Sequence, residues 1–274
     1  MKPRRYPFFI TCLTGFVLCL SAVSIAEAAG KRKNPTSKVF VAAAKGEGQI
    51  DNGEKIEALT VKSAYTVEGS TIETKADSSS TLVFSNGTAL TVGANSRFVV
   101  KRFLQEPFAP NRTDLDVEPS ISQTAVKMMR GSIGLCTSRL IAGSSMTYQT
   151  PHGTINIRGR KVMVEVAENE TIVSLLEGDV TVMGDDVGSS HNLKPGQQAT
   201  LRKAAPNQPT VITIRSISPE ANTKADEQVS LACIARRTVY FETADRETEE
   251  IKPVLVQPAA LPTQFTVSPD RLPN

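Results

Sequence analysis

The chain has two imidazole side chains, and neither lies in a pattern that supports catalysis. His152 follows Pro151 and precedes Gly153, and His191 follows two serines. Both settings are typical of turns, so we predict that both side chains lie in solvated loops. The sequence has no nucleophile elbow, phosphate-binding glycine loop or zinc-binding histidine motif. We therefore expect no catalytic residues and no cofactor.

Asp185 and Asp186, together with Glu177, are acidic residues that could be considered for hydrolysis or calcium binding. Adjacent residues of a strand point to opposite faces, and Gly184 and Gly188 flank the two aspartates. This setting favours a solvated turn over a functional site. We expect no metal site here.

Cys136 and Cys233 are the cysteines that lie outside the N-terminal apolar segment, and both have apolar neighbours. No C-x-x-C pair and no nearby histidine indicates a zinc site, since structural zinc takes about four such ligands. Two interpretations stay open. The residues are either two separately buried thiols or a long-range disulfide, which an exported protein can keep in an oxidising compartment.

The N-terminus has the organisation of a secretory signal peptide. Basic residues precede a mostly apolar segment from Phe8 to Ile25, and an Ala-x-Ala site ends at Ala28. Cleavage is expected before Ala29, so that residues 1–28 or 1–29 are removed, and we treat residues 1–29 as the signal-peptide segment. An uncleaved anchor is the alternative, because the apolar segment is just long enough to cross about 30 Å of hydrocarbon. We expect an exported, most simply periplasmic protein that does not span a membrane again; secretion and membrane tethering remain alternatives.

The composition and net charge of the chain indicate which classes of molecule it can bind. The chain has 274 residues, is 40% hydrophobic and 22% charged, and carries a formal net charge of +3, which is typical of a globular protein. Most of that charge belongs to the predicted signal peptide. A nearly neutral chain without long basic runs lacks the charge that phosphate binding requires, so nucleic acid is excluded as a partner.

The chain after the signal peptide predicts an all-β fold over residues 38–203. Short segments rich in Val, Ile, Thr and Leu alternate with Gly, Asn, Asp and Ser clusters. This rhythm is typical of a solenoid-like or sandwich-like stack of short strands. Two of the expected strands, 125–130 and 132–137, are separated by Gly131. Residues 104–124 contain three prolines and predict a long excursion between strands.

A β-hairpin is predicted around Asn86 and Gly87, and the length of its loop determines how its two strands pair. A two-residue loop would put Phe84 and Leu90 on opposite faces of the sheet. A three-residue loop that ends at Gly87, with this glycine in the left-handed conformation, pairs Leu82 with Leu90 and keeps Phe84 on their side. We expect the three-residue loop.

The C-terminal part has a different pattern. Residues 204–251 predict a linker, a strand over 211–217 and a helix that begins after Ser218 and ends near Arg236, because Ser, Pro and Glu in succession are typical of a helix N-terminus. Five prolines follow Lys252, so residues 252–274 are predicted to be a Pro-rich extended or disordered tail.

Short motifs between the strands resemble, in order and spacing, the FecR domain, the periplasmic part of FecR- and PupR-type sigma-factor regulators. The resemblance covers about residues 39–202. The family has a V-R-G-T motif, and in this chain Arg160 occupies the position of its threonine. We therefore expect no hydrogen bond from a threonine hydroxyl at this position. The matching residues specify tight turns. They include Gly69, Asn86, Gly87, Arg158, Gly159, Glu177, Gly178, Pro195 and Gly196.

The resemblance implies a solenoid-like fold and a relay that meets an outer-membrane receptor outside the cytoplasm. Only about five residues precede the apolar segment, so a cytoplasmic sigma-binding domain does not fit, and no receptor-contacting subdomain is recognisable in residues 203–274. We therefore predict a non-enzymatic exported module that binds an envelope protein or cell-wall polymer, through a strand edge or residues 104–124. The alternative is a component of trans-envelope signalling that regulates a sigma factor through another chain.

Overall fold

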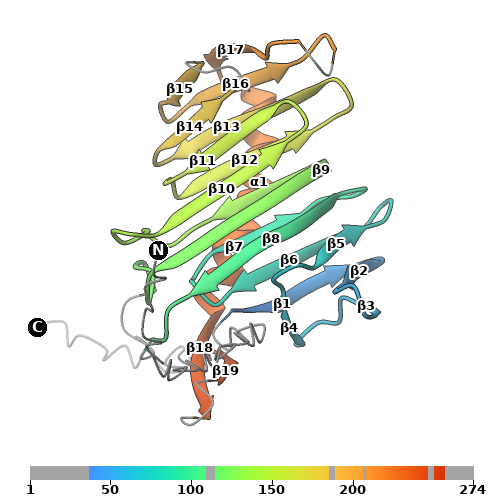
Figure 1. The fold of residues 1–274 in the computed structure, drawn as a ribbon, viewed down its shortest axis with the longest axis vertical. Coiled ribbons are helices and arrows are strands. Elements are labelled where there is room, and N and C mark those ends of the chain that lie inside the picture. The colour runs from blue at the N-terminus through green and yellow to red at the C-terminus, as the bar shows by residue number, and fades with distance from the viewer. Residues whose placement is uncertain (1–36, 109–114, 185–188, 206–207, 246–249, 257–274) are drawn as a thin grey trace, which may run out of the picture. The chain divides into compact units, whose positions relative to one another are not determined.

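A computed structural model describes residues 37–108, 115–184, 189–205, 208–245 and 250–256 of the protein (Figure 1). The predicted signal peptide, with its cleavage position between Ala28 and Ala29, lies outside these ranges, and so do Asp185 and Asp186. The described residues form 19 strands and one helix. Within them, no helix combines the length and apolar character that a membrane crossing requires.

Most strands belong to two layers that share one long strand, β9. We call the layers sheet A and sheet B. Sheet A is antiparallel throughout, and its spatial order is β4 (Ala64–Thr66), β1 (Lys38–Lys45), β6 (Ser79–Phe84), β7 (Ala89–Val92), β9 (Ser122–Cys136), β12 (Lys161–Val166), β13 (Glu170–Glu177), β16 (Gln197–Arg202) and β17 (Val211–Ser216).

Sheet B has a matching order in which β9 and β10 form a parallel pair and all other pairs are antiparallel. The order is β3 (Ile56–Ala58), β2 (Gly48–Asp51), β5 (Thr71–Thr74), β8 (Arg97–Gln105), β9, β10 (Ser145–Thr150), β11 (Gly153–Ile157), β14 (Val180–Met183) and β15 (Ser190–Leu193). The predicted all-β stack of short strands is therefore confirmed.

β9 passes from one sheet to the other at Gly131. Its residues before this glycine pair with β8 and β10 of sheet B, and those after it pair with β7 and β12 of sheet A. Gly131 has a φ of +92°, and a side chain there would collide with the backbone of Ser96. The prediction of two strands, 125–130 and 132–137, is thus wrong, because the glycine bends one continuous strand instead of ending it.

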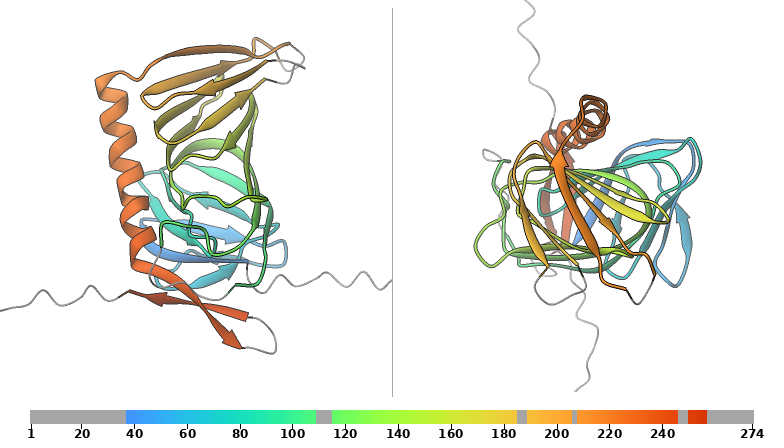
Figure 2. Two further views of the ribbon diagram at one scale, coloured as in Figure 1. Left: turned by 90° about the vertical axis from the view of Figure 1, so that its left-hand side faces the viewer. Right: turned by 90° about the horizontal axis from the view of Figure 1, so that it is seen from above.

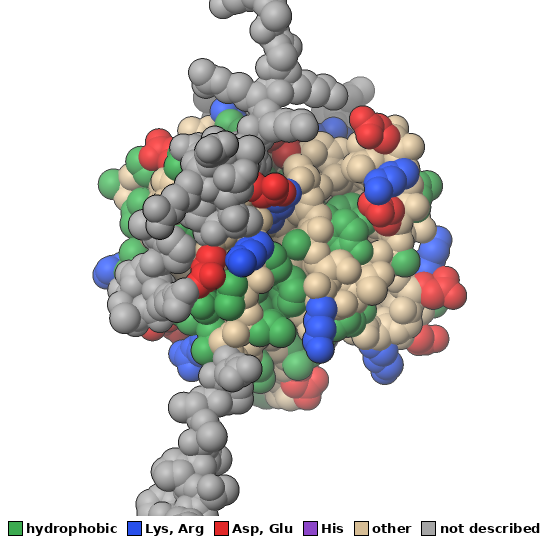
Figure 3. Space-filling view, turned by 90° about the horizontal axis from the view of Figure 1, so that it is seen from below, with side chains coloured by type: hydrophobic (Ala, Val, Ile, Leu, Met, Phe, Trp, Pro, Cys, Tyr) green, Lys and Arg blue, Asp and Glu red, His purple; other side chains and the backbone are tan. Residues whose placement is uncertain are grey.

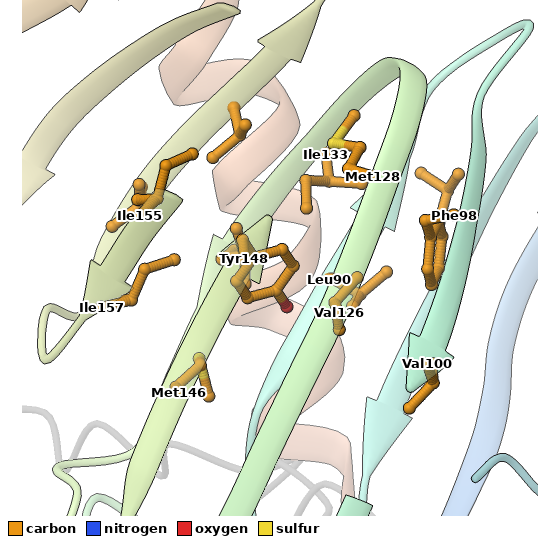
Figure 4. Close-up of a cluster of buried hydrophobic side chains, with 14 of the residues drawn as sticks. Leu90, Phe98, Val100, Val126, Met128, Ile133, Met146, Tyr148, Ile155 and Ile157 are labelled. Atoms are coloured by element: carbon orange, nitrogen blue, oxygen red, sulfur yellow. The ribbon is translucent and has the colours of Figure 1, made fainter. Parts of the chain in front are cut away.

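The hydrophobic core lies between the two sheets (Figure 4). Along β9, Val126 and Met128 are buried at alternate positions, as expected for a strand with one face in the core. Tyr148 of β10 lies beside them and is fully buried. Burial raises the pKa of its hydroxyl far above the usual value, so this group stays protonated.

The hairpin of β6 and β7 has the predicted register. Leu82 lies opposite Leu90, and the N–H of Phe84 donates to the carbonyl of Thr88 at 2.8 Å, which leaves a three-residue loop. Gly87 has a φ of +80°. The two leucines and Phe84 belong to one buried cluster, as the longer loop requires.

Helix α1 (Pro219–Thr238) lies against the outer face of sheet A, between β17 and β18 in the chain (Figure 2). The hydroxyl of Ser218 caps it by accepting from the N–H of Ala221 at 3.3 Å, as predicted. The helix approaches β9 closely at Gly134, where a Cβ would lie 2.9 Å from the backbone of Gln228. The Gln228 side chain donates to the carbonyl of Thr91 at 2.8 Å.

A disulfide joins the end of β9 to this helix. Cys136 and Cys233 are bonded, with their Cα atoms 5.1 Å apart and a sequence separation of 97. Of the two interpretations that the sequence left open, the structure has the long-range bridge.

A second, two-stranded sheet follows the helix and consists of β18 (Val239–Asp245) and β19 (Glu250–Leu255). The prediction that residues 252–274 lack regular structure is wrong for residues 252–255. Pro253 fits β19 because, among the described strands, β19 pairs with β18 alone, so some of its N–H groups face away from the ladder. Residues 257–274 lie outside the described ranges.

Breaking the disulfide is expected to lower the free energy of unfolding by about 2–5 kcal/mol, because the bridge closes a loop of nearly a hundred residues. Urea unfolding monitored by circular dichroism, with and without dithiothreitol, measures the difference. The Cys136→Ser/Cys233→Ser double variant is the control, since reductant should leave its midpoint unchanged. Equal midpoints for the oxidised and reduced wild-type protein would contradict the prediction.

Candidate functional site

Two of the motifs that resemble the FecR domain form a pair of stacked turns. The N–H of Arg158 donates to the carbonyl of Asp179 at 2.9 Å, and the N–H of Arg160 donates to the carbonyl of Glu177 at 3.0 Å. Gly178, between these acceptors, has a φ of +105°, and a Cβ on it would lie 2.5 Å from the nitrogen of Arg160. The glycine is needed here for both its conformation and its lack of a side chain.

Arg160, which replaces the family's threonine, binds two carboxylates instead. Its guanidinium lies 3.4 Å from Glu177 and 3.3 Å from Asp116, a residue of the excursion between β8 and β9. A threonine hydroxyl reaches this turn from the residue that follows β9, because Thr137 donates to the carbonyl of Gly159. The substitution therefore adds a charged link from the turns to the excursion.

Asp116 also binds Arg236 of α1, whose guanidinium is 2.5 Å away. Arg236 is only 3% exposed, which is unusual for arginine. It further donates to the hydroxyl of Ser138 at 3.0 Å and to the carbonyl of Leu115. The hydrogen bond and charge of Arg236, assisted by Arg160, hold the pKa of Asp116 below its usual range.

One nitrogen of this buried arginine has no partner. The Nε of Arg236 finds no acceptor among the residues that the structure describes. A pocket of about 40 Å³ opens beside it, between α1, β18, the β6–β7 hairpin and the excursion. We call it the Arg236 pocket. Its apolar lining includes Phe84, Phe108, Leu115, Val117, Tyr240 and Phe241.

The Arg236 pocket has room for about two waters or for the end of one side chain. It lies near the end of the molecule that carries β18 and β19. Hydrophobic side chains gather on that end, and charged side chains surround them (Figure 3). An apolar pocket with a convergent donor is suited to binding rather than to bond-breaking chemistry.

Glu118 anchors the excursion beside this pocket. Its carboxylate is buried and accepts from the hydroxyl of Ser122 and, at 3.3 Å, from the N–H of Ile141. Burial raises the pKa of this carboxyl, and the donors partly oppose the shift. Asn86, one of the family motif residues, donates to Ser122 at 3.0 Å and so supports the same anchor.

The prediction for His152 is wrong. The side chain is 4% exposed rather than solvated, its Nδ1 lies 2.9 Å from the hydroxyl of Thr171, and its Nε2 lies 3.3 Å from the carbonyl of Glu168. Burial lowers the pKa of this imidazole. His191 is exposed as predicted, although it lies in β15 rather than in a loop.

The other predicted motif residues shape turns. Gly69 and Gly196 have φ values of +79° and +82°, with open space where a side chain would project, and Pro195 precedes the second of them. Gly87 is the motif glycine that also lines the Arg236 pocket. Within the described parts of the chain, no three His, Cys, Asp or Glu side chains are grouped so that they could hold a metal ion.

The geometry defines a two-layer β stack with glycine-dependent turns and a helix fastened to one face. Residues 70–181 match the model of the FecR protein family. This part of the chain is therefore similar to a FecR domain, in agreement with the sequence motifs. The matched residues include the stacked turns, β9 and the partners of Arg236, which are Leu115, Asp116 and Ser138.

Two solved structures are similar to the chain, with low sequence identity and a low TM-score. Both are crystal structures of a candidate anti-sigma factor from Parabacteroides distasonis, and they are 15% and 14% identical to this chain. In each case the alignment covers 68% of this chain and 99% of the other, with a TM-score of 0.40, so the likeness carries no argument here. No curated protein sequence matches the chain at a significant level.

Gly178 and Gly196 both have a positive φ, but the stacked turns predict that replacing them by alanine lowers the free energy of unfolding by different amounts. Gly196→Ala should lower the free energy of unfolding by about 1–2 kcal/mol, the cost of the left-handed conformation alone. Gly178→Ala should cost more than about 3 kcal/mol, because the methyl group also meets backbone atoms of the neighbouring turn. Chemical unfolding of both variants tests this, and equal losses would contradict the proposed stacking constraint.

His152 predicts how stability depends on pH. Its pKa is lower in the folded protein than the ordinary 6.5, so the unfolded chain binds more protons at mildly acidic pH. Its stabilising contribution is complete above about pH 6.5 and is lost as the pH falls towards the folded-state pKa.

Urea unfolding between pH 7.5 and 5 measures this dependence. His152→Gln should flatten the decline of the free energy of unfolding below pH 6.5, whatever its effect on stability at pH 7.5. His191→Gln, a change at an exposed position, is the matched control and should keep the wild-type slope. A wild-type slope in His152→Gln would show that this imidazole does not cause the decline.

Proposed function

We propose that the protein is an exported, non-enzymatic FecR-domain module that binds a protein partner in the bacterial cell envelope and takes part in signal regulation. The family match supports the regulatory role, because FecR domains in sigma-factor regulators meet other proteins outside the cytoplasm. The signal-peptide pattern of residues 1–29 supports export, with cleavage before Ala29. The periplasm is the compartment that agrees with both observations.

The observation that carries the binding role is the unpartnered Nε of Arg236 beside an apolar pocket. A buried donor without an acceptor costs about 1–3 kcal/mol. A bound group that brings an acceptor removes this cost and gains further free energy by burying apolar surface. The Arg236 pocket therefore favours a ligand group with both features.

A protein segment meets these requirements better than a cell-wall polymer does. An aliphatic side chain can occupy the space between Phe108 and Val117, while a carbonyl of the same segment accepts from Arg236. Sugar polymers instead need many hydroxyl-binding side chains, and the lining is mostly apolar. The partner is thus expected to be an envelope protein with an exposed apolar residue.

A second candidate function is a role in trans-envelope signalling, in which another chain holds the sigma factor. The family match favours it. In that case the pocket's partner would be the signalling domain of an outer-membrane receptor or the membrane-bound chain that reaches the cytoplasm. Both versions use the same binding surface, and identification of the captured protein separates them.

Capture from an envelope extract tests the proposal. Tagged mature protein, beginning at Ala29, is cross-linked in the extract, and captured proteins are quantified by mass spectrometry. We compare the wild type with Phe108→Asp and Val117→Asp, which place a charge in the pocket. Each should reduce capture of a specific envelope protein at least about tenfold, which corresponds to roughly 1.4 kcal/mol.

Leu231→Asp is the matched control, because Leu231 is 54% exposed on the outer side of α1 and does not line the pocket. It should capture as much partner as the wild type. Thermal unfolding checks that all three variants are folded. Equal capture by every folded variant, or recovery of cell-wall polymer alone, would overturn the proposal.

A further inference from the structure

The end of the stack formed by β17 leaves part of the core uncovered. Among the described strands, the register of β17 is with β16 alone, and it is the last strand of sheet A (Figure 1). Ile212 and Ile214 pack against the core cluster but are only partly buried. Solenoid-like stacks need a cap at each end because the last layer otherwise exposes its inner face.

Sheet B offers no cover for these isoleucines. Its last strand, β15, exposes three of its four residues and buries only Leu193. Helix α1 starts at Pro219 and packs against the outer face of sheet A, so it does not cross the open end. Within the described residues, the isoleucines of β17 are therefore only partly covered, and a further strand paired with β17 would bury them more fully.

The free edge of β17 has few of the features that usually prevent pairing between proteins. Natural edges are blunted by charged side chains, especially lysine, and by proline, bulges or very short strands. β17 has six residues in regular register with β16, and its sequence VITIRS contains neither lysine nor proline. At the other end of the stack, β3 and β4 have three residues each. The charged residue of β17, Arg215, donates hydrogen bonds from its guanidinium to the side chain of Gln198 on the adjacent strand β16.

We propose that β17 pairs with β17 of a second copy of this chain, antiparallel and about a two-fold axis that passes through Thr213. In this register Thr213 lies opposite its own copy, and Ile212 lies opposite Ile214 of the second copy. Directly opposite residues share a face of the sheet. The isoleucines of both copies then meet on the core side and cover one another.

The pattern of the strand favours a second copy over an unrelated partner. Its apolar inward positions are arranged symmetrically about Thr213, so the strand is complementary to itself. On the outer face, Val211 would lie opposite Arg215 of the second copy, so no like charges are opposed. Val211 is 64% exposed in the single chain. This inference does not depend on the proposed function, because the Arg236 pocket involves other strands.

A single pair of six-residue strands is a small interface, so we expect a dimer with a Kd on the order of 10 μM. Sedimentation equilibrium of the mature chain between 1 and 500 μM should show a reversible monomer–dimer transition. Thr213→Lys places two lysines opposite each other at the axis and should raise the Kd at least about tenfold. Thr213 is exposed, so this variant should fold normally.

Cysteine cross-linking tests the register. In Thr213→Cys the new thiols lie opposite each other, within the Cα separation of about 7 Å that a disulfide permits. Mild oxidation should therefore convert most of the dimer to a covalent form. Val211→Cys is the matched control on the same exposed face, and its thiols would be more than about 12 Å apart in this register.

Two results would overturn the proposal. One is a wild-type chain that stays monomeric up to 500 μM, which would leave the edge to a different partner. The other is cross-linking of Val211→Cys as efficient as that of Thr213→Cys, which would rule out pairing about Thr213. Loss of partner capture by the pocket variants has no effect on either result, so the two proposals fail separately.

Discussion

The bend of β9 at Gly131 is the constraint on which the rest of the structure depends. This strand pairs with β8 and β10 before the bend and with β7 and β12 after it, so the two sheets have one strand in common and one core between them. The backbone of Ser96 leaves no room for a side chain at the bend. A residue other than glycine would have to separate the layers or break the strand.

The second half of β9 also provides the platform for α1. Gly134 lets the helix approach the strand closely, Cys136 bonds to it, and Ser138, just beyond the strand, receives a hydrogen bond from Arg236. The helix thereby presents Arg236 to Asp116, which would otherwise be an ordinary acidic residue in an irregular segment. The Arg236 pocket is thus a product of helix docking rather than of the β stack alone.

Local patterns were sufficient to predict those parts of the molecule whose causes are local. The hairpin register followed from the side on which Phe84 must lie, and the start of α1 followed from Ser218 and the proline after it. The disulfide between Cys136 and Cys233 was one of two open interpretations, because the spacing of two cysteines along the chain does not show whether they are close in the folded protein. The family motifs indicated turns, and Gly69, Asn86, Gly87 and Gly196 lie in turns, whereas Glu177 belongs to strand β13.

The features that escaped prediction depend on partners far away in sequence. His152 is buried through contacts with Thr171 and Glu168, and nothing in its own turn indicates them. Arg236 and Asp116 are 120 positions apart, and Glu118 is held by donors from three different segments. For the part of β19 that follows Lys252, the prolines suggested irregular structure because the tolerance of a two-stranded sheet for proline is not visible in the sequence.

The disulfide has a topological consequence. The disulfide between Cys136 and Cys233 closes a covalent ring that contains β10 to β17 and most of α1. Both ends of this segment, which includes the open end of the stack, are therefore held at the disulfide. A protease cut in any loop inside this ring leaves the two fragments joined. The half of the molecule that bears the exposed edge of β17 therefore stays attached to the half that bears the pocket for as long as the bond is intact.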